Sequence, residues 1–356
     1  MAGVSILLAI GILEVLSSTA PPGCREGGGF IFFKKHILSI LIGLLMLFIF
    51  RNLDYDRLFG ISKLLLLISI FLLVGVFFQG NGAKGGAYRW IRLAPGITFQ
   101  PSEFAKLAIV IYTASFLTRK QALLYSFKEA LLPLLIVTFG IVGLILIQPD
   151  MGTAVLIAGV SLILWWVGGI STLKIVGLLL VLGVLGVIFI WMEPYRMDRV
   201  LAFLNPWESP HGYGYQIIQS LLAFGMGGLW GMGLGKGLQK FYYLPAPHTD
   251  FIFAVIGEEL GFLGSVAILV MYVLIGWASF SIAKGAPDAF GKLLGIGVTF
   301  LILLQAFINL GGVTNFIPCT GIPLPFVSYG GSNMIINLTS VGILLSIARR
   351  KEINGN

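Results

Sequence analysis

The stretch Gln239-Lys-Phe-Tyr-Tyr-Leu-Pro-Ala-Pro-His-Thr-Asp250 runs directly into Phe251-Ile-Phe-Ala-Val-Ile-Gly-Glu-Glu259. A polar loop punctuated by prolines therefore meets a strongly apolar segment at Asp250. Such a change predicts the point at which a helix enters a membrane. We expect the carboxylate of Asp250 at the boundary between water and hydrocarbon, where it can meet both solvent and a membrane-anchored molecule.

The composition of the chain predicts a membrane protein. Its 356 residues are 57% hydrophobic and only 11% charged, and the mean hydropathy is +0.97. Soluble domains are about 25% charged. The net charge is +8, but the basic residues lie between apolar runs and form no basic domain. Membrane orientation and contact with anionic membrane lipids explain this distribution, and no nucleic-acid partner is expected.

The predicted fold is an all-α polytopic membrane protein with about ten transmembrane helices, in which residues 1–356 form a single transmembrane domain. A helix that spans a bilayer needs about 20 mostly apolar residues. Pro21 and Pro22 would obstruct signal-peptide cleavage after the first run, so this run is expected to be a retained span. The apolar runs lie near residues 3–18, 36–50, 61–78, 103–118, 131–147, 152–168, 173–192, 251–280, 290–310 and 329–348.

Ten spans place both termini on one side of the membrane, and the basic tail Arg349-Arg350-Lys351 favours the cytoplasm. Residues 193–249, between the seventh and eighth spans, then form one large extracytoplasmic loop. Its apolar, glycine-rich middle, Tyr213 to Gly235, predicts an interfacial or re-entrant segment. The stretch Gly231–Gly237 lacks the Ser or Thr of a phosphate loop, so its glycines are expected to permit close packing or tight turns.

A charged pair opens the fourth span, in Gln100-Pro-Ser-Glu-Phe-Ala-Lys106. Glu103 and Lys106 are three residues apart and therefore share one face of a helix. Ionisable groups inside a span usually face the interior of the bundle or a wet cavity. The pair either locks the packing of helices or forms the wall of a site, and the residues alone leave both interpretations open.

Asp250 has two interpretations of equal weight. Thr249 or Asp250 could cap the helix that follows, or Asp250 could act in catalysis. The N-terminus of a helix favours an ionised carboxylate, which suits a general base or a metal ligand. His248 is either a base or a solvated loop side chain, and Asp150 is expected to cap a helix or form a turn.

The loop Gly321–Ser332 combines prolines and paired glycines with apolar residues, which predicts irregular backbone at membrane depth. Its hydroxyl groups, on Ser328, Tyr329 and Ser332, and its amides could bind an anion, although a rigid packing plug is an equal alternative.

Basic residues of the predicted outer loops either contact lipid headgroups or form a cleft for a phosphate-bearing ligand. Those that could form such a cleft are Arg89, Arg92, Arg196, Arg199, Lys236 and Lys240.

Several motifs together resemble the SEDS family (shape, elongation, division and sporulation), and its division members most of all. They are Asn205-Pro-Trp, Gly214-Tyr-Gln-Ile-Ile-Gln-Ser220, Gln239-Lys-Phe-Tyr-Tyr-Leu, His248–Gly261 and Gly321–Ser332. The similarity runs from about Gln79 to Arg350, and Asn333 stands where relatives usually carry Ser.

The resemblance implies a ten-span peptidoglycan glycosyltransferase of the bacterial cytoplasmic membrane. Such an enzyme polymerises lipid II, an undecaprenyl-diphosphate-linked disaccharide pentapeptide, on the outer side of the membrane. The essential aspartate of the family falls on Asp250, and its Glu and Lys fall on Glu103 and Lys106. A class B penicillin-binding protein is the implied partner. The resemblance implies no tightly bound cofactor. It does imply a divalent cation, Mg²⁺ or Mn²⁺, for which Asp250 is a possible ligand.

The hypothesis that follows makes Asp250 the general base of a single displacement at C1 of the donor. Lys106, Arg89, Arg92 and Arg199, or the cation, would stabilise the leaving diphosphate. The other predicted substrate-binding residues are Glu103, His248, Ser328, Tyr329 and Ser332.

Three alternatives remain: a flippase or transporter of lipid-linked precursors, an elongation or sporulation paralogue, and a scaffold for which Asp250 is dispensable. The position of Asp250 at the outer mouth favours the enzyme.

Overall fold

The computed structural model describes residues 1–19, 28–78, 89–94, 97–245 and 247–354. Its contacts divide the chain into two compact units. Unit 1 comprises Met1–Leu38, Leu178–Ile275 and Gln305–Gly330, and unit 2 comprises Ser39–Gly177, Gly276–Leu304 and Gly331–Asn356. Cys24 and Lys84 lie outside the described residues.

The all-α, polytopic fold is confirmed. Eight described helices are long and apolar enough to cross a membrane, and they include most of the predicted spans. Two further helices, α4 (Pro101–Arg119) and α6 (Met151–Val167), coincide with the remaining apolar runs. The number ten itself stays a prediction. The eight helices belong to α1 (Ala2–Thr19), α2 (Gly28–Asn52), α3 (Asp56–Phe78), α5 (Leu132–Ile147) with the turn before it, α7 (Thr172–Trp191), α11 (Ile252–Lys284), α12 (Ala289–Val313) and α13 (Gly331–Asn354).

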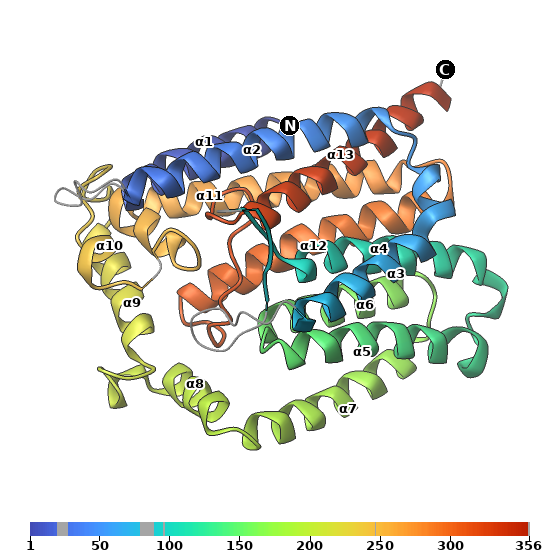
Figure 1. The fold of residues 1–356 in the computed structure, drawn as a ribbon, viewed down its shortest axis with the longest axis horizontal. Helices are drawn as coiled ribbons and strands as arrows, with labels where there is room; N and C mark the ends of the chain where they lie inside the picture. Colours follow the sequence, from blue (N-terminus) through green and yellow to red (C-terminus); the bar gives the residue numbers. More distant parts are fainter. Residues whose placement is uncertain (20–27, 79–88, 95–96, 246, 355–356) are drawn as a thin grey trace. The chain divides into compact units, whose positions relative to one another are not determined.

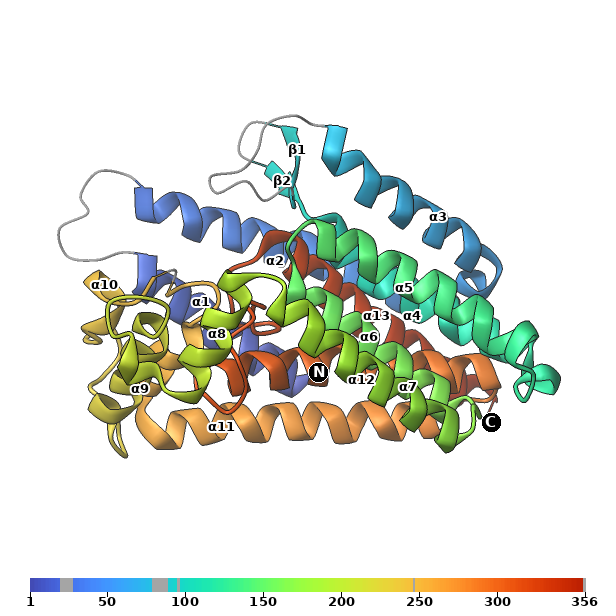
Figure 2. The ribbon, with the colours of Figure 1, turned by 90° about the horizontal axis from the view of Figure 1, so that it is seen from below.

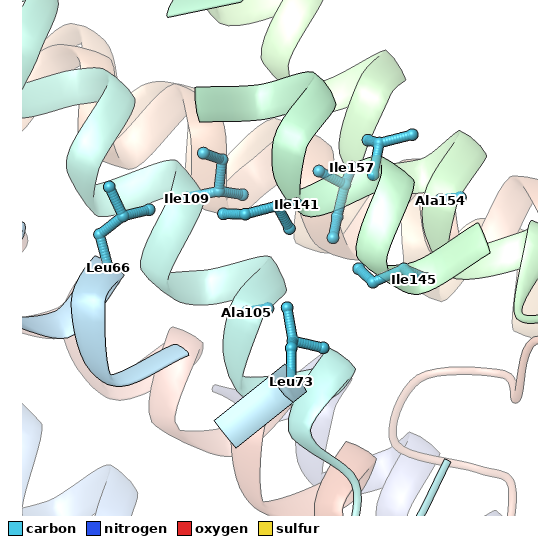
Figure 3. Packing of buried hydrophobic residues seen from close by; sticks show 9 residues of the cluster. Leu66, Leu73, Ala105, Ile109, Ile141, Ile145, Ala154 and Ile157 are labelled. Atoms are coloured by element: carbon cyan, nitrogen blue, oxygen red, sulfur yellow. The ribbon is translucent and has the colours of Figure 1, made fainter. Parts of the chain in front are cut away.

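The core of unit 2 is formed by α3, α4, α5 and α6. Its buried aliphatic side chains interdigitate where these four helices meet (Figure 3). Ala105 is small enough to let α4 approach its neighbours closely, and Ile109 fills the space one turn further along the helix. The labelled members of this cluster are Leu66, Leu73, Ala105, Ile109, Ile141, Ile145, Ala154 and Ile157.

A short hairpin leads into α4. Strands β1 (Ile91–Ala94) and β2 (Ile97–Phe99) are antiparallel, with Ile91 opposite Phe99 (Figure 2). The hairpin delivers Gln100 to the start of α4, where Pro101 occupies the first turn, as the sequence predicts.

In unit 1, the residues between α7 and α11 fold into short helices, which are α8 (Pro194–Leu204), α9 (Tyr215–Gly227) and α10 (Gln239–Tyr242), with a 3-10 turn, η3, at Pro206–Glu208 (Figure 1). None of the three reaches the length of a span, which agrees with the prediction of an interfacial or re-entrant segment.

Helix α11 is broken at Gly261, whose φ of 67° and ψ of −164° favour glycine. The break leaves backbone groups of α11 without partners inside the helix, and these groups form hydrogen bonds with the glycine-rich segment before α10. The amide of Met232 donates to the carbonyl of Glu258 at 2.9 Å, and the amide of Phe262 donates to the carbonyl of Gly228 at 2.9 Å. Broken helices are tolerated at membrane depth when other backbone satisfies their polar groups, and this segment does so.

Gly231 shows why this segment contains so many glycines. A Cβ atom at Gly231 would collide with the carbonyl oxygen of Glu259. Gly233 and Gly235 have φ of 98° and 80° and meet no such obstacle, so they serve turns. The prediction of close packing or tight turns is confirmed, with each role at different glycines.

Candidate active site

Asp250 lines a cavity of about 420 Å³ in unit 1. The residue is half-buried and lies two positions before the first residue of α11. Arg199 of α8 lines the same cavity, so the structure brings these two predicted site residues together. The other lining residues are Ala202, His211, Gly212, Tyr213, Tyr215, Gln216, Ile217, Pro245, Phe251, Cys319 and Gly321.

The backbone of Asp250 is held by Asn309, a buried residue of α12. The Nδ2 atom of Asn309 donates to the carbonyl of Asp250 at 2.8 Å and to the carbonyl of Ile322 at 2.7 Å. Sequence reasoning missed Asn309, although a polar side chain inside a predicted span is itself a signal.

Gly321 lies against the carboxyl group of Asp250. Its φ is +74°, and a Cβ there would lie 3.3 Å from Oδ2 of Asp250. The irregular loop after α12 thus forms one side of the carboxylate's surroundings.

Arg199 also contacts this loop, since its Nη1 donates to the carbonyl of Cys319 at 3.4 Å. Burial raises the pKa of the Cys319 thiol, so the thiol stays protonated at neutral pH.

His248 is half-buried in an aromatic cluster, so it is solvated only in part. Its ring centroid is 5.2 Å from that of Phe32 and 5.6 Å from that of Tyr329. The amide of Tyr329 donates to the carbonyl of His248 at 2.9 Å. Burial lowers the pKa of the His248 imidazole and raises the pKa of the Tyr329 phenol, so both rings are neutral at pH 7.

Ser328 and Ser332 are buried, and their hydroxyls serve the protein's own backbone. The Oγ of Ser328 accepts from the amide of Leu324 at 2.8 Å, and the Oγ of Ser332 accepts from the amide of Gln100 at 2.9 Å. Each hydroxyl still has a hydrogen to donate. The loop is irregular, as predicted.

Glu103 and Lys106 pair in unit 2, as the sequence allows. Their charged groups are 2.8 Å apart, and both side chains are almost completely buried. An ion pair in such surroundings needs its partner, because either charge alone would be strongly disfavoured.

Asp150 has the predicted capping role, because its Oδ1 accepts from the amide of Thr153 at 3.2 Å at the start of α6. Its Oδ2 accepts from Ser102 and Gln100 at 3.3 Å each, which ties this turn to the start of α4.

Arg89 binds the turn between α5 and α6, where its Nε donates to the carbonyl of Gln148 at 3.0 Å and its Nη2 donates to the carbonyl of Pro149. Arg92 is exposed on β1. The predicted site residues therefore belong to both units: Asp250, Arg199, His248, Ser328 and Tyr329 to unit 1, and Glu103, Lys106, Arg89, Arg92 and Ser332 to unit 2.

Two acidic residues of α11 bind backbone amides at the end of the stretch Gly231–Gly237, which superficially resembles a phosphate loop. Glu258 accepts from the amide of Leu238 at 2.7 Å, and Glu259 accepts from the amide of Gly235 at 2.7 Å. Glu259 also forms a fully buried ion pair with Lys240. The amides thus bind the protein's own carboxylates, a role that sequence reasoning missed.

The described residues contain no group of three or more His, Cys, Asp or Glu side chains arranged to hold a metal. Mg²⁺ is commonly held by one or two carboxylates together with substrate phosphates. Asp250 with substrate oxygens would fit that pattern, and the cation stays a prediction.

Comparison with known proteins gives consistent matches over nearly the whole chain. The family described as "Cell cycle protein", which covers FtsW, RodA and SpoVE, matches residues 1–353. Stage V sporulation protein E of Bacillus subtilis (strain 168) is 42% identical over 97% of this chain and 94% of its own length. The probable peptidoglycan glycosyltransferase FtsW of Geobacter sp. (strain M18) is 41% identical over 97% of this chain and 94% of its own.

Two solved structures share the fold. A chain of a peptidoglycan synthase complex that coordinates polymerization and crosslinking superposes with a TM-score of 0.81 at 30% identity, covering 99% of this chain and 98% of that one. The rod shape determining protein RodA of Thermus thermophilus superposes with a TM-score of 0.72 at 28% identity, covering 98% of this chain and 95% of that one.

Proposed function

The chain belongs to the family of FtsW, RodA and SpoVE and is a peptidoglycan glycosyltransferase, and we propose that it polymerises lipid II with Asp250 as the general base. The observation that carries this assignment of the base is the cavity of unit 1. It combines the carboxyl group of Asp250, the guanidinium of Arg199 and hydrogen-bonding side chains within about 420 Å³. Such a cleft with a few polar groups is typical of a substrate site.

In the proposed reaction, a hydroxyl of the acceptor sugar attacks C1 of the donor sugar. A sugar hydroxyl has a high pKa, so Asp250 takes its proton as the new C–O bond forms. The bond from C1 to the diphosphate breaks at the same time, and the lipid diphosphate leaves. One displacement inverts C1 and needs no covalent nucleophile.

The leaving diphosphate gains negative charge, so cations near it would lower the barrier. Arg199, which lines the cavity with Asp250, is proposed for this role, and a divalent cation would supply further positive charge when bound. Lys106, Arg89 and Arg92 are proposed as further substrate contacts. The proposed substrate contacts also include Glu103, His248, Ser328, Tyr329 and Ser332. For Ser328 and Ser332, the hydroxyl hydrogens that their backbone bonds leave available support the proposal.

The protein is a multi-pass membrane protein. We place it in the bacterial cytoplasmic membrane with both termini in the cytoplasm, and Asp250 then faces the outer side. A class B penicillin-binding protein is the proposed partner, since the similar synthase complex couples polymerization to crosslinking.

We assign the protein to cell division because its motifs most resemble those of the division members of the family. Identity to a sporulation protein is nearly the same, at 42% against 41%, so a sporulation role is the second candidate. A fluorescent fusion at mid-cell in growing cells supports division. Recruitment only to a developing spore would assign the chain to sporulation instead.

Asp250→Asn tests the assignment of the base. The purified full-length variant should make no glycan from lipid II, because the amide cannot accept the proton. Glu208→Gln is the matched control, since Glu208 is an exposed carboxylate of the same long loop and lines no part of the cavity. Both variants should unfold at the temperature of the wild type. Wild-type glycan synthesis by folded Asp250→Asn would refute the proposal.

The flippase alternative is tested with the same two variants. A transporter would move fluorescent lipid II across vesicle membranes without making glycan. Glycan synthesis by the purified wild type, lost in Asp250→Asn, excludes transport as the sole activity.

A further inference from the structure

The cavity around Asp250 has a second wall, built by the turn before α9 and the first residues of that helix. His211, Tyr213, Tyr215 and Gln216 all line it. None of them was singled out from the sequence as a site residue, although Tyr215 and Gln216 fall within one of the motifs that resemble the SEDS family. Their side chains combine aromatic surface with polar groups that form hydrogen bonds.

This wall is a built feature of unit 1. A Cβ atom at Gly214 would collide with the carbonyl of Pro206, so a glycine is required where the turn folds back on η3. The amide of Tyr215 donates to the carbonyl of Gly212 at 3.2 Å, and the amide of Ile218 donates to the carbonyl of Gly214 at 2.9 Å. The tyrosines therefore extend from a fixed turn.

The wall and the proposed base are anchored on one helix. The buried Oγ of Ser220, in α9, donates to the carbonyl of Val313 at 2.7 Å, at the end of α12. Asn309, one turn earlier on α12, holds the backbone of Asp250. The distance across the cavity is thus set by α12, as a site that must place a hydroxyl against a base requires.

Charge indicates which part of the substrate fits. Among the described lining residues, the permanently cationic side chain is Arg199, and the carboxyl group of Asp250 offsets it. The leaving diphosphate is proposed to meet Arg199, whereas the wall itself offers a diphosphate no permanently cationic side chain. A neutral ring with several hydroxyls matches both the balanced charge and the polar, aromatic wall.

We propose that the wall formed by His211, Tyr213, Tyr215 and Gln216 is the recognition site for the uncharged terminal sugar of the acceptor. The volume of about 420 Å³ accommodates a sugar end, and it is too small for the lipid and the peptide as well. This inference rests on the proposed polymerase reaction, because that reaction requires a sugar hydroxyl to reach Asp250.

Binding is tested by saturation-transfer NMR on the full-length wild type in nanodiscs. The probe is the soluble β-1,4-linked disaccharide of N-acetylglucosamine, and inorganic pyrophosphate is the competitor. We expect a saturation-transfer signal on the sugar protons, and equimolar pyrophosphate should leave that signal unchanged. Displacement of the sugar by pyrophosphate would show that the wall formed by His211, Tyr213, Tyr215 and Gln216 takes the diphosphate and would overturn the inference.

Gln216→Ala tests the wall itself. Gln216 is exposed, so its truncation should leave the fold intact. Loss of one hydrogen-bonding group should raise the KM for lipid II about tenfold and leave kcat nearly unchanged. Gln219→Ala is the control, because Gln219 lies on the same helix and does not line the cavity.

The two proposals fail separately. The recognition wall alone would be overturned if Asp250→Asn is inactive while Gln216→Ala has the same KM and the same sugar binding as Gln219→Ala. Glycan synthesis by Asp250→Asn would remove the proposed base, whatever the sugar probe does.

Discussion

Asn309 holds the backbone of Asp250 in place. One amide group donates to two carbonyls and joins the backbone before α11 to the irregular loop after α12. The amide acts on the backbone of Asp250, so it is a positioning residue for the proposed base. Catalysis tolerates little error in such placement, and a shift of about 1 Å can cost about 100-fold in rate.

We therefore expect Asn309→Ala to lower kcat by about 10- to 100-fold and to change KM little. Steady-state polymerisation of lipid II measures both constants. Gln305→Ala is the matched control, since Gln305 lies one turn away on α12 and donates to Pro323 of the same loop at 2.9 Å. Equal losses of kcat in the two variants would indicate general loosening of the loop and contradict a specific role for Asn309.

His248 gives a prediction about pH. Burial against Phe32 and Tyr329 lowers the pKa of the imidazole in the folded protein. An unfolded histidine takes up a proton below about pH 6.5, whereas folded His248 does so only at lower pH. The unfolded state then binds more protons, so stability should fall as pH drops below about 6.5 and level off once folded His248 is protonated.

His248→Phe keeps an aromatic ring and removes this titration. Thermal unfolding in detergent between pH 7.5 and pH 5 should therefore show a smaller loss of stability for the variant than for the wild type. Identical pH profiles would mean that His248 does not contribute.

At the scale of elements, the long loop before α11 is fastened by a buried ion pair. Lys240 of α10 and Glu259 of α11 are both fully buried, and Ser17 of α1 donates to Glu259 at 2.9 Å. Removal of one partner leaves a buried charge without compensation, which typically costs about 3–5 kcal/mol. Replacement of both by apolar residues is far less damaging.

Lys240→Met should therefore destabilise the protein by about 3–5 kcal/mol, and Lys240→Met with Glu259→Leu should recover part of that loss. Unfolding in detergent measures both free energies. A double variant less stable than Lys240→Met would show that the hydrogen bonds from Ser17 and Gly235 to Glu259 outweigh the ion pair.

The helices themselves could be predicted, since an apolar run in a bilayer must satisfy its own backbone as a helix. Their ends could not. Helix α2 begins at Gly28, before the apolar run at 36–50, because polar residues such as Lys34 and Lys35 continue the helix. The break at Gly261 falls inside the predicted span 251–280, where the glycine after Glu258 and Glu259 does not by itself indicate a break.

The candidate site was predictable in part for a similar reason. Asp250 lies where polarity changes, and Glu103 with Lys106 follows helical spacing. The contacts of Asn309 and of Glu259 join residues far apart in the sequence, and no local pattern encodes them. His248 shows the converse, since its loop position indicates solvent while its aromatic neighbours come from distant segments.

For the whole molecule, two contacts support the proposed orientation. Arg350, near the end of α13, pairs with Asp54 at 2.9 Å in the connection between α2 and α3, so both lie at one end of unit 2. In unit 1, Ser17 at the end of α1 bonds to Glu259, near the start of α11. A cytoplasmic N-terminus would then place the start of α11 and the loop before it on the outer side.

Cysteine labelling tests this orientation in a Cys24→Ser, Cys319→Ala background. Glu208 is exposed in the long loop, and Ala289 is exposed at the start of α12. In spheroplasts, a membrane-impermeant maleimide should label Glu208→Cys directly and Ala289→Cys only after permeabilisation. The two sites flank α11 in the sequence, so a membrane span between them predicts opposite labelling and each site controls for the other. The reverse pattern would place Asp250 on the cytoplasmic side, where it could not act as the base for synthesis on the outer face.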